Sequence, residues 1–188
     1  MGCLSLPFFG QPSQKTPAPP VDIGFTSGIA GNISGEAPLY SFDEAMANLA
    51  QINFTSGAKS PANETRNTSI LYIMGTGLDT DANAKSWIFA VQFENTTSLV
   101  TYDNQGMSRV NWSAGFSGKE IHIDQIISPG KLFDQNQEAI SGMSQANSTV
   151  SRQLVLEGDN YTLILSGQGA SRILMFNATT GVLISSHE

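Results

Sequence analysis

The sequence predicts an α+β protein built as a tandem duplicated helix plus antiparallel β-meander, with both helices packed on one face of the sheet. Three observations predict this fold. Two stretches with helical spacing of apolar residues each begin at a serine suited to cap a helix. Each stretch is followed by short segments in which apolar and polar residues alternate between turn sequences, which is typical of antiparallel strands. The two sets of strands correspond at a constant offset of 74 residues, as from Trp87 to Tyr161.

The first predicted segment, residues 1–38, differs in composition from the rest of the chain. Five prolines between positions 4 and 20 favour extended backbone, and the glycine-rich residues 21–38 favour a loop, with an irregular strand around 23–25. Cys3 is the only cysteine, which excludes an intramolecular disulfide. A Gly2-Cys3 start before such a tether resembles the processed start of a prokaryotic lipoprotein, and this resemblance implies a lipid on Cys3. An unmodified free thiol is the alternative.

The second predicted segment, residues 39–115, begins with a helix over residues 42–52. Ser41 can accept a hydrogen bond from an early backbone N–H while Glu44 reaches back, which is the capping-box arrangement. Strands are expected over residues 70–74, 87–93 and 99–102, with one more around 110–112. Trp87 and Phe89 share one face of their strand and alternate with Ile88, so one face of this strand is predicted to be buried.

The third predicted segment, residues 116–188, repeats this order. Ser128 is the expected N-cap, Pro129 takes the first helical position, and the helix is expected to run to about Met143. An antiparallel meander follows, with strands expected over residues 152–156, 161–165, 172–176 and 182–185. A helix with three or four strands cannot bury its apolar face alone, so two copies sharing one sheet are favoured. The alternative is that any two amphipathic hairpins look alike.

The hairpin that ends Leu99-Val-Thr-Tyr-Asp-Asn-Gln-Gly106 resembles the last hairpin of PepSY and PepSY-like modules. Its counterpart, Arg172-Ile-Leu-Met-Phe-Asn-Ala-Thr-Thr-Gly181, is similar, with Asn177 in place of the aspartate. The resemblance covers about residues 39–186. It implies a small α+β module outside the membrane that binds or inhibits protein partners such as peptidases and does not catalyse. The added residues 53–86 depart from the compact pattern of the family.

Asparagine sequons are far more frequent than composition predicts. Nine of the 13 asparagines precede x-Ser/Thr, although Ser and Thr are only 36 of the 188 residues. Glycans at such sites would supply solubility and require an exterior location; turn chemistry in a Ser/Thr/Asn-rich surface is the alternative. A lipoprotein-like start with dense sequons resembles archaeal cell-surface proteins. The predicted glycosylation sites are Asn32, Asn53, Asn63, Asn67, Asn95, Asn111, Asn147, Asn160 and Asn177.

Charge and motif content exclude several classes of function. The net charge of -7 repels nucleic acid and anionic lipid, and no apolar stretch is long enough to cross a membrane. His122, expected on a strand, and His187 at the C-terminus complete no catalytic triad. Asp79-x-Asp81-x-Asn83 begins like a calcium loop but lacks its glycine and its final glutamate, so a polar turn is expected. No catalytic residue, metal site or cofactor is predicted.

These observations together predict a non-enzymatic, membrane-anchored lipoprotein outside the cytoplasm. It is expected to bind, and in some cases inhibit, a protein or peptide partner through a sheet face or an edge strand. The membrane contact is expected through the lipid on Cys3 only. A structural glycoprotein of the cell envelope without a dedicated ligand is the alternative, and a hydrolase with an unrecognised site is a third class.

Overall fold

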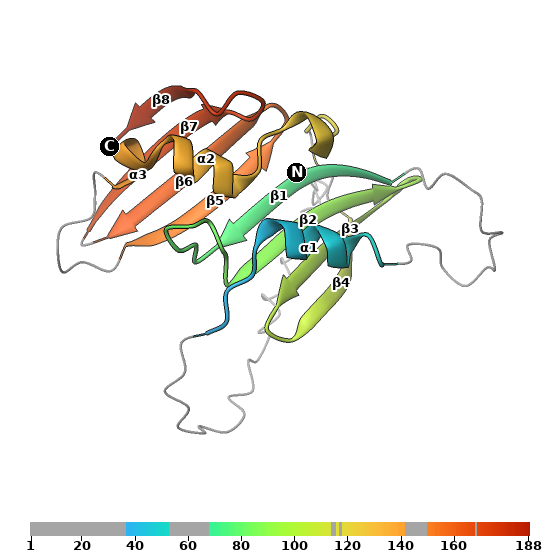
Figure 1. Cartoon of the computed structure of the whole chain (residues 1–188). Helices are drawn as coiled ribbons and strands as arrows, with labels where there is room; N and C mark the ends of the chain where they lie inside the picture. Colours follow the sequence, from blue (N-terminus) through green and yellow to red (C-terminus); the bar gives the residue numbers. More distant parts are fainter. Residues whose placement is uncertain (1–36, 53–67, 114–115, 117, 142–149, 168) are drawn as a thin grey trace, which may run out of the picture. The chain divides into compact units, whose positions relative to one another are not determined.

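The computed structural model describes residues 37–52, 68–113, 116, 118–141, 150–167 and 169–188, all of them within one compact unit formed by residues 36–188. The expected strand at 23–25 lies outside these residues. The described residues form an α+β fold with one antiparallel sheet of eight strands in the order β4-β3-β2-β1-β5-β6-β7-β8 (Figure 1). The strands are β1 Thr68–Thr76, β2 Ser86–Phe93, β3 Thr96–Asp103, β4 Gly106–Trp112, β5 Ser151–Glu157, β6 Asn160–Gly167, β7 Ala170–Asn177 and β8 Leu183–His187.

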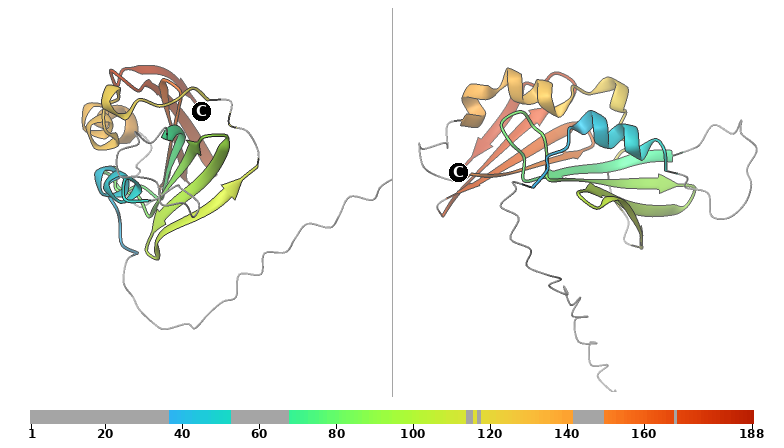
Figure 2. Two further views of the ribbon diagram at one scale, coloured as in Figure 1. Left: turned by 90° about the vertical axis from the view of Figure 1, so that its right-hand side faces the viewer. Right: turned by 60° about the horizontal axis from the view of Figure 1, so that its bottom comes forward.

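The helices lie on one face of this sheet, which the view along its edge shows most clearly (Figure 2). They are α1 Phe42–Leu49, the short 3-10 helix η1 Ile123–Gln125, α2 Pro129–Gln135 and α3 Gln137–Ser141. The apolar sides of α1 and α2 belong to the same core as the sheet residues beneath them, such as Phe89 and Leu163, which are fully buried. The opposite face of the sheet carries no helix among the described residues.

Each long helix begins at the serine that the sequence predicts. The backbone N–H of Glu44 donates to Ser41 Oγ at 3.1 Å, and that of Lys131 donates to Ser128 Oγ at 3.3 Å. The reciprocal half of the expected capping box is wrong, because the Glu44 carboxylate instead accepts a 2.7 Å hydrogen bond from the Tyr102 hydroxyl. The Glu44 carboxylate is therefore bonded to Tyr102 on β3 and does not cap its own helix.

The second predicted helix is broken, which corrects the expectation of one helix from 129 towards 143. Asn136 separates α2 from α3 with a φ of -121°, and its side chain donates to the carbonyls of Leu132 and Gly181 at 2.9 and 3.0 Å. The side chain takes the Leu132 carbonyl that a continuous helix would pair with the Asn136 backbone N–H, and its second hydrogen bond ties the break to Gly181, which is distant in sequence. Met143 lies outside the described residues.

The strands of the two meanders have matching registers. Phe89 pairs with Val100 across β2 and β3, and Leu163 pairs with Leu174 across β6 and β7, each residue 74 positions after its counterpart. At the centre of the sheet, Met74 of β1 lies opposite Ile88 of β2, and Val155 of β5 lies opposite Thr162 of β6. Met74 and Val155 also pair with each other at the junction; they are equivalent through their partners Ile88 and Thr162, although they are 81 and not 74 positions apart.

Two buried aromatic side chains fix the helix starts to the sheet. Trp87 of β2 donates from Nε1 to the carbonyl of Tyr40 at 2.9 Å, and Tyr161 of β6 donates from its hydroxyl to the carbonyl of Ile127 at 2.7 Å. Each acceptor residue directly precedes the N-cap of its helix. Trp87 fits because Gly75 faces it: a Cβ on Gly75 would come within 2.7 Å of the indole ring.

His122 is not on a strand, contrary to the sequence prediction. It precedes η1, and its carbonyl accepts from the backbone N–H of Gln125 at 2.9 Å. The flanking segment is held to the sheet by a 2.7 Å hydrogen bond from the N–H of Ile121 to the carbonyl of Ile70. The apolar–polar alternation around His122 therefore reflects the burial of Ile121 beside β1, and not a strand of the sheet.

Candidate binding surface

The face of the sheet opposite the helices carries a row of side chains that crosses all eight strands. Its members pair from one strand to the next in the antiparallel register, and Met74 and Val155 stand at its centre. Strand alternation places them on the face opposite the core residues. We call this set the central row; it consists of Ser108, Thr101, Ile88, Met74, Val155, Thr162, Met175 and Ser185.

No member of the central row is charged, and its side chains are half-buried except for the exposed Ser108. The thioether of Met74 is held in place by two neighbours: Gln153 Nε2 lies 2.9 Å from Met74 Sδ, and the Tyr72 hydroxyl lies 3.4 Å from it. The pKa of Tyr72 is raised by partial burial and, to a smaller extent, by the Glu157 carboxylate. Tyr72 therefore remains a neutral hydrogen-bonding group at neutral pH.

Three aromatic rings extend this surface over β1 to β4. The ring of Phe116 lies 5.7 Å from that of Tyr72 and 6.3 Å from that of Trp112, measured between centroids. Trp112 is 42% exposed at the end of the edge strand. Rigid aromatic rings with one free face are common anchors in protein interfaces.

Both edges of the sheet also expose apolar side chains. Apart from Leu39, the large apolar residues exposed in the described part of the chain lie on β4, on β8 with its preceding residue, or on the neighbouring β7. Edge strands with free backbone groups and apolar side chains can pair with another extended chain. The exposed residues are Val110, Trp112, Ile173, Val182, Leu183 and Ile184.

Two of the four predicted glycosylation sites that the structure describes, Asn160 and Asn177, share the face of the central row and lie two residues from Thr162 and Met175. Asn95 and Asn111 are exposed, whereas Asn160 and Asn177 are partly exposed. The register places all four towards one end of the sheet, where β2 and β5 end. The Asn177 Oδ1 atom accepts from the backbone N–H groups of Thr179 and Thr180 at 3.1 and 2.9 Å. Cys3, Asn32, Asn53, Asn63, Asn67 and Asn147 lie outside the described residues.

The acidic turn before β2 is closed by its own hydrogen bonds. Asp79 Oδ1 accepts from the backbone N–H groups of Asp81 and Asn83, both at 2.8 Å, and Asp79 Oδ2 accepts from the Asn83 side chain. His122 and His187 are both exposed. Within the ranges that the structure covers, no three residues among His, Cys, Asp and Glu come together as metal ligands.

Sequence reasoning missed the central row as a unit. The signal that could have found it lies in the alternate residues of each strand that face away from the core. These residues include hydroxyl and aliphatic side chains such as Ile88, Thr101 and Thr162, and no lysine or arginine. What the sequence does not supply is the pairing of β1 with β5, which joins the two outward phases into one surface.

Comparison with protein-family models, with curated proteins and with solved structures gives no match for this chain. No helix in the described ranges is both long enough and apolar enough to cross a membrane.

Proposed function

We propose that the chain is a non-enzymatic lipoprotein outside the cytoplasm that binds a protein or peptide partner with its central row and the adjoining aromatic rings. The observation that carries this proposal is the face opposite the helices, which is uncharged along the row and half-buried, and which has Trp112 exposed at one side. Interface centres are depleted in charge and enriched in aromatic residues and methionine. Met74, Met175 and Trp112 fit that composition.

We further propose that residues 39–115 and 116–188 are two PepSY-like repeats. The matching registers, the paired counterparts Met74 and Val155, and the two aromatic hydrogen bonds to the helix starts support a single plan used twice. The break at Asn136 is the main departure from that plan. Two copies that share one sheet give a partner a wide, rigid surface instead of a single marginal hairpin.

The position of the sequons supports attachment to the outer face of a membrane through Cys3. Tyr40, near the start of the described body, pairs with Ala84 at the end of the sheet where β2 begins. Asn95 and Asn160 lie at the other end. A chain anchored through its N-terminal segment would therefore carry these glycans at the end of the sheet remote from its entry into the fold.

The alternative function is a structural glycoprotein of the cell envelope without a dedicated ligand. It predicts glycans distributed over every face. The four described sequon asparagines lie towards one end of the sheet, which favours partner binding over this alternative, although Asn160 and Asn177 share the face of the central row.

A site-specific cross-linking experiment tests the proposal in the native cell. A photo-reactive phenylalanine analogue is placed at Thr101 or Thr162 in the central row and, as matched controls, at the exposed helix positions Lys131 and Asp134. We expect one discrete cross-linked species from both row positions and none from the helix positions. Equal labelling from row and helix positions, or no labelling from either row position, contradicts partner binding by this face.

A further inference from the structure

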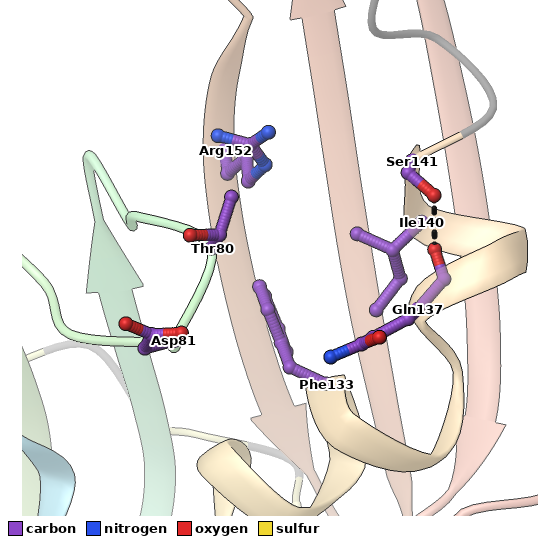
Figure 3. Close-up of a pocket in the computed structure, with 7 residues that line it drawn as sticks. All are labelled: Thr80, Asp81, Phe133, Gln137, Ile140, Ser141 and Arg152. Carbon is purple, nitrogen blue, oxygen red and sulfur yellow. Dashed lines mark hydrogen bonds between the residues drawn. The ribbon is translucent and has the colours of Figure 1, made fainter.

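A cavity lies on the helix side of the sheet, between the helices and the turn that precedes β2. It has a volume of about 250 Å³ and is lined by Thr80, Asp81, Phe133, Gln137, Ile140, Ser141 and Arg152. In Figure 3, Phe133 and Ile140 approach it from α2 and α3, Thr80 and Asp81 from the turn, and Arg152 from β5. The turn is held beside β5 by a 3.1 Å hydrogen bond from the N–H of Leu78 to the carbonyl of Arg152.

The Arg152 guanidinium is the unusual group in this cavity. Its Nε atom is buried and has no hydrogen-bond partner within the residues the structure describes. A buried donor without an acceptor is costly, and the cost is larger when the donor is charged. An acceptor supplied from outside the described fold would remove this cost.

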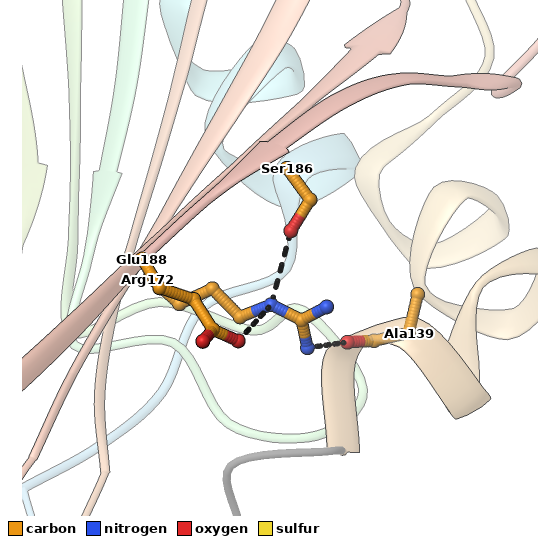
Figure 4. Close-up of polar contacts among 4 residues, drawn as sticks. All are labelled: Ala139, Arg172, Ser186 and Glu188. Carbon is orange, nitrogen blue, oxygen red and sulfur yellow. Dashed lines mark hydrogen bonds and ion pairs between the residues drawn. The ribbon is translucent and has the colours of Figure 1, made fainter.

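Arg172 lies on the same face of the sheet and, unlike Arg152, has a hydrogen-bond partner for its Nε atom within the described residues. Its Nε donates to Ser186 Oγ at 3.2 Å and lies 3.8 Å from a Glu188 oxygen, and its NH1 donates to the carbonyl of Ala139 at 3.1 Å (Figure 4). Arg172 therefore serves the fold, whereas Arg152 lines the cavity with a guanidinium whose buried Nε has no partner among the described residues.

The remaining walls define what can fill the cavity. Phe133 and Ile140 are 2% and 7% exposed and supply apolar surface. An apolar cavity of roughly 150 Å³ holds a benzene ring, so the space here accommodates such a ring together with a carboxylate. The Ser141 hydroxyl is already used, since it donates to the Gln137 carbonyl, while the Gln137 amide extends towards Phe133 (Figure 3).

Asp81 limits the charge of the occupant. Its side chain is exposed at the rim and forms no ion pair with Arg152 among the described residues. A second carboxylate that reached the rim would be repelled by Asp81, so the occupant is expected to carry one carboxylate, directed at Arg152 and away from the rim. We propose that this cavity binds a small organic monocarboxylate whose aromatic or aliphatic body packs on Phe133 and Ile140 while its carboxylate accepts from Arg152.

Calorimetric titration of the full chain with phenylacetate tests the proposal, with the neutral isostere phenylacetamide as ligand control. We expect phenylacetate to bind at least about tenfold more tightly than phenylacetamide, since a charge-assisted hydrogen bond separates them. Arg152→Gln should weaken phenylacetate by a similar factor, and Arg172→Gln should leave it unchanged. Asp81→Asn should tighten it by removing the rim charge.

A second measurement does not depend on the folding of a variant. In the wild-type chain, the NMR signal of the Arg152 Nε–H should shift as phenylacetate saturates, while that of Arg172 stays in place. The carboxylate could belong to a free small acid or to the C-terminus of a peptide. Titration with the peptide Gly-Gly-Phe distinguishes these sources: tighter binding of phenylacetate indicates a free acid, and tighter binding of the peptide indicates a peptide C-terminus. Equal binding of phenylacetate and phenylacetamide, equal binding of sulfate, or an unmoved Arg152 signal overturns the proposal.

Discussion

The hydrogen bond from Tyr161 to the carbonyl of Ile127 gives the most quantitative prediction. Tyr161 is 1% exposed, and its hydroxyl lies 2.7 Å from the carbonyl oxygen that precedes the N-cap of α2. Tyr161→Phe keeps the ring and opens no large cavity, so its main effect is a buried carbonyl without a donor. We expect a loss of about 1–3 kcal/mol in the free energy of unfolding at neutral pH.

The same residue gives this loss a defined pH dependence. Burial raises the pKa of Tyr161 well above its usual value of 10.0. A group with a raised folded-state pKa contributes stability that is fully present below the unfolded pKa and is lost as pH rises through the interval up to the folded pKa. At pH 11, one unit above the usual value, wild-type stability falls by about 1.4 kcal/mol through this tyrosine alone. Tyr161→Phe has no hydroxyl to ionise, so the difference in the free energy of unfolding between wild type and variant should be about 1.4 kcal/mol smaller at pH 11 than at pH 7.

Urea unfolding at pH 7 and pH 11, followed by the fluorescence of the buried Trp87, measures both quantities. Tyr40→Phe is the matched control, because Tyr40 is only partly buried and packs by its ring at 4.9 Å from that of Tyr102. The control should change stability by no more than about 0.5 kcal/mol. A Tyr161→Phe deficit that is the same at pH 7 and pH 11 would show that burial does not raise the pKa of this hydroxyl in the folded chain.

Two further predictions concern packing and modification. Gly75→Ala places a Cβ 2.7 Å from the Trp87 ring and should destabilise the fold by about 1–3 kcal/mol. Gly130→Ala in α2 should stabilise the fold by about 0.4–1 kcal/mol, because the nearest atom to the added Cβ is the Asp81 carbonyl oxygen at 3.8 Å. Thermal unfolding of the two variants checks these opposite signs. Mass spectrometry of native material should show a lipid mass on Cys3 and hexose-containing masses on Asn95 and Asn160, and unmodified peptides at all three positions would contradict the exterior, anchored location.

Local sequence signals were sufficient for most of the secondary structure. The serine caps at Ser41 and Ser128 and the alternation around Trp87 depend on neighbouring residues only, so the helix starts and strand positions could be predicted. The eight strands overlap the predicted ranges, and most extend beyond them by two to four residues; β2 and β8 are longer by one residue, and β8 begins one residue later than predicted. The helix ends could not be predicted as well, because the break at Asn136 depends on Gly181, which is distant in sequence.

The candidate sites required tertiary structure. Pairing of Met74 with Val155 joins two outward strand faces into the central row, and no local pattern specifies that pairing. Similarly, Arg152 is an ordinary strand arginine in the sequence. Its importance comes from the cavity that Phe133 and the turn at Thr80 form around it, and from the lack of a partner for its buried Nε.

Oxidative footprinting on intact cells shows whether a partner occupies the face of the sheet opposite the helices. Hydroxyl radicals modify tyrosine, methionine and tryptophan side chains that solvent reaches. We predict that Met74, Met175 and Trp112 are modified more slowly on cells than in the purified chain, while Met46 on α1 and Met107 on the helix side of β4 react at the same rate in both. Equal rates for Met74, Met175 and Trp112 on cells and in the purified chain would show that no partner covers this face.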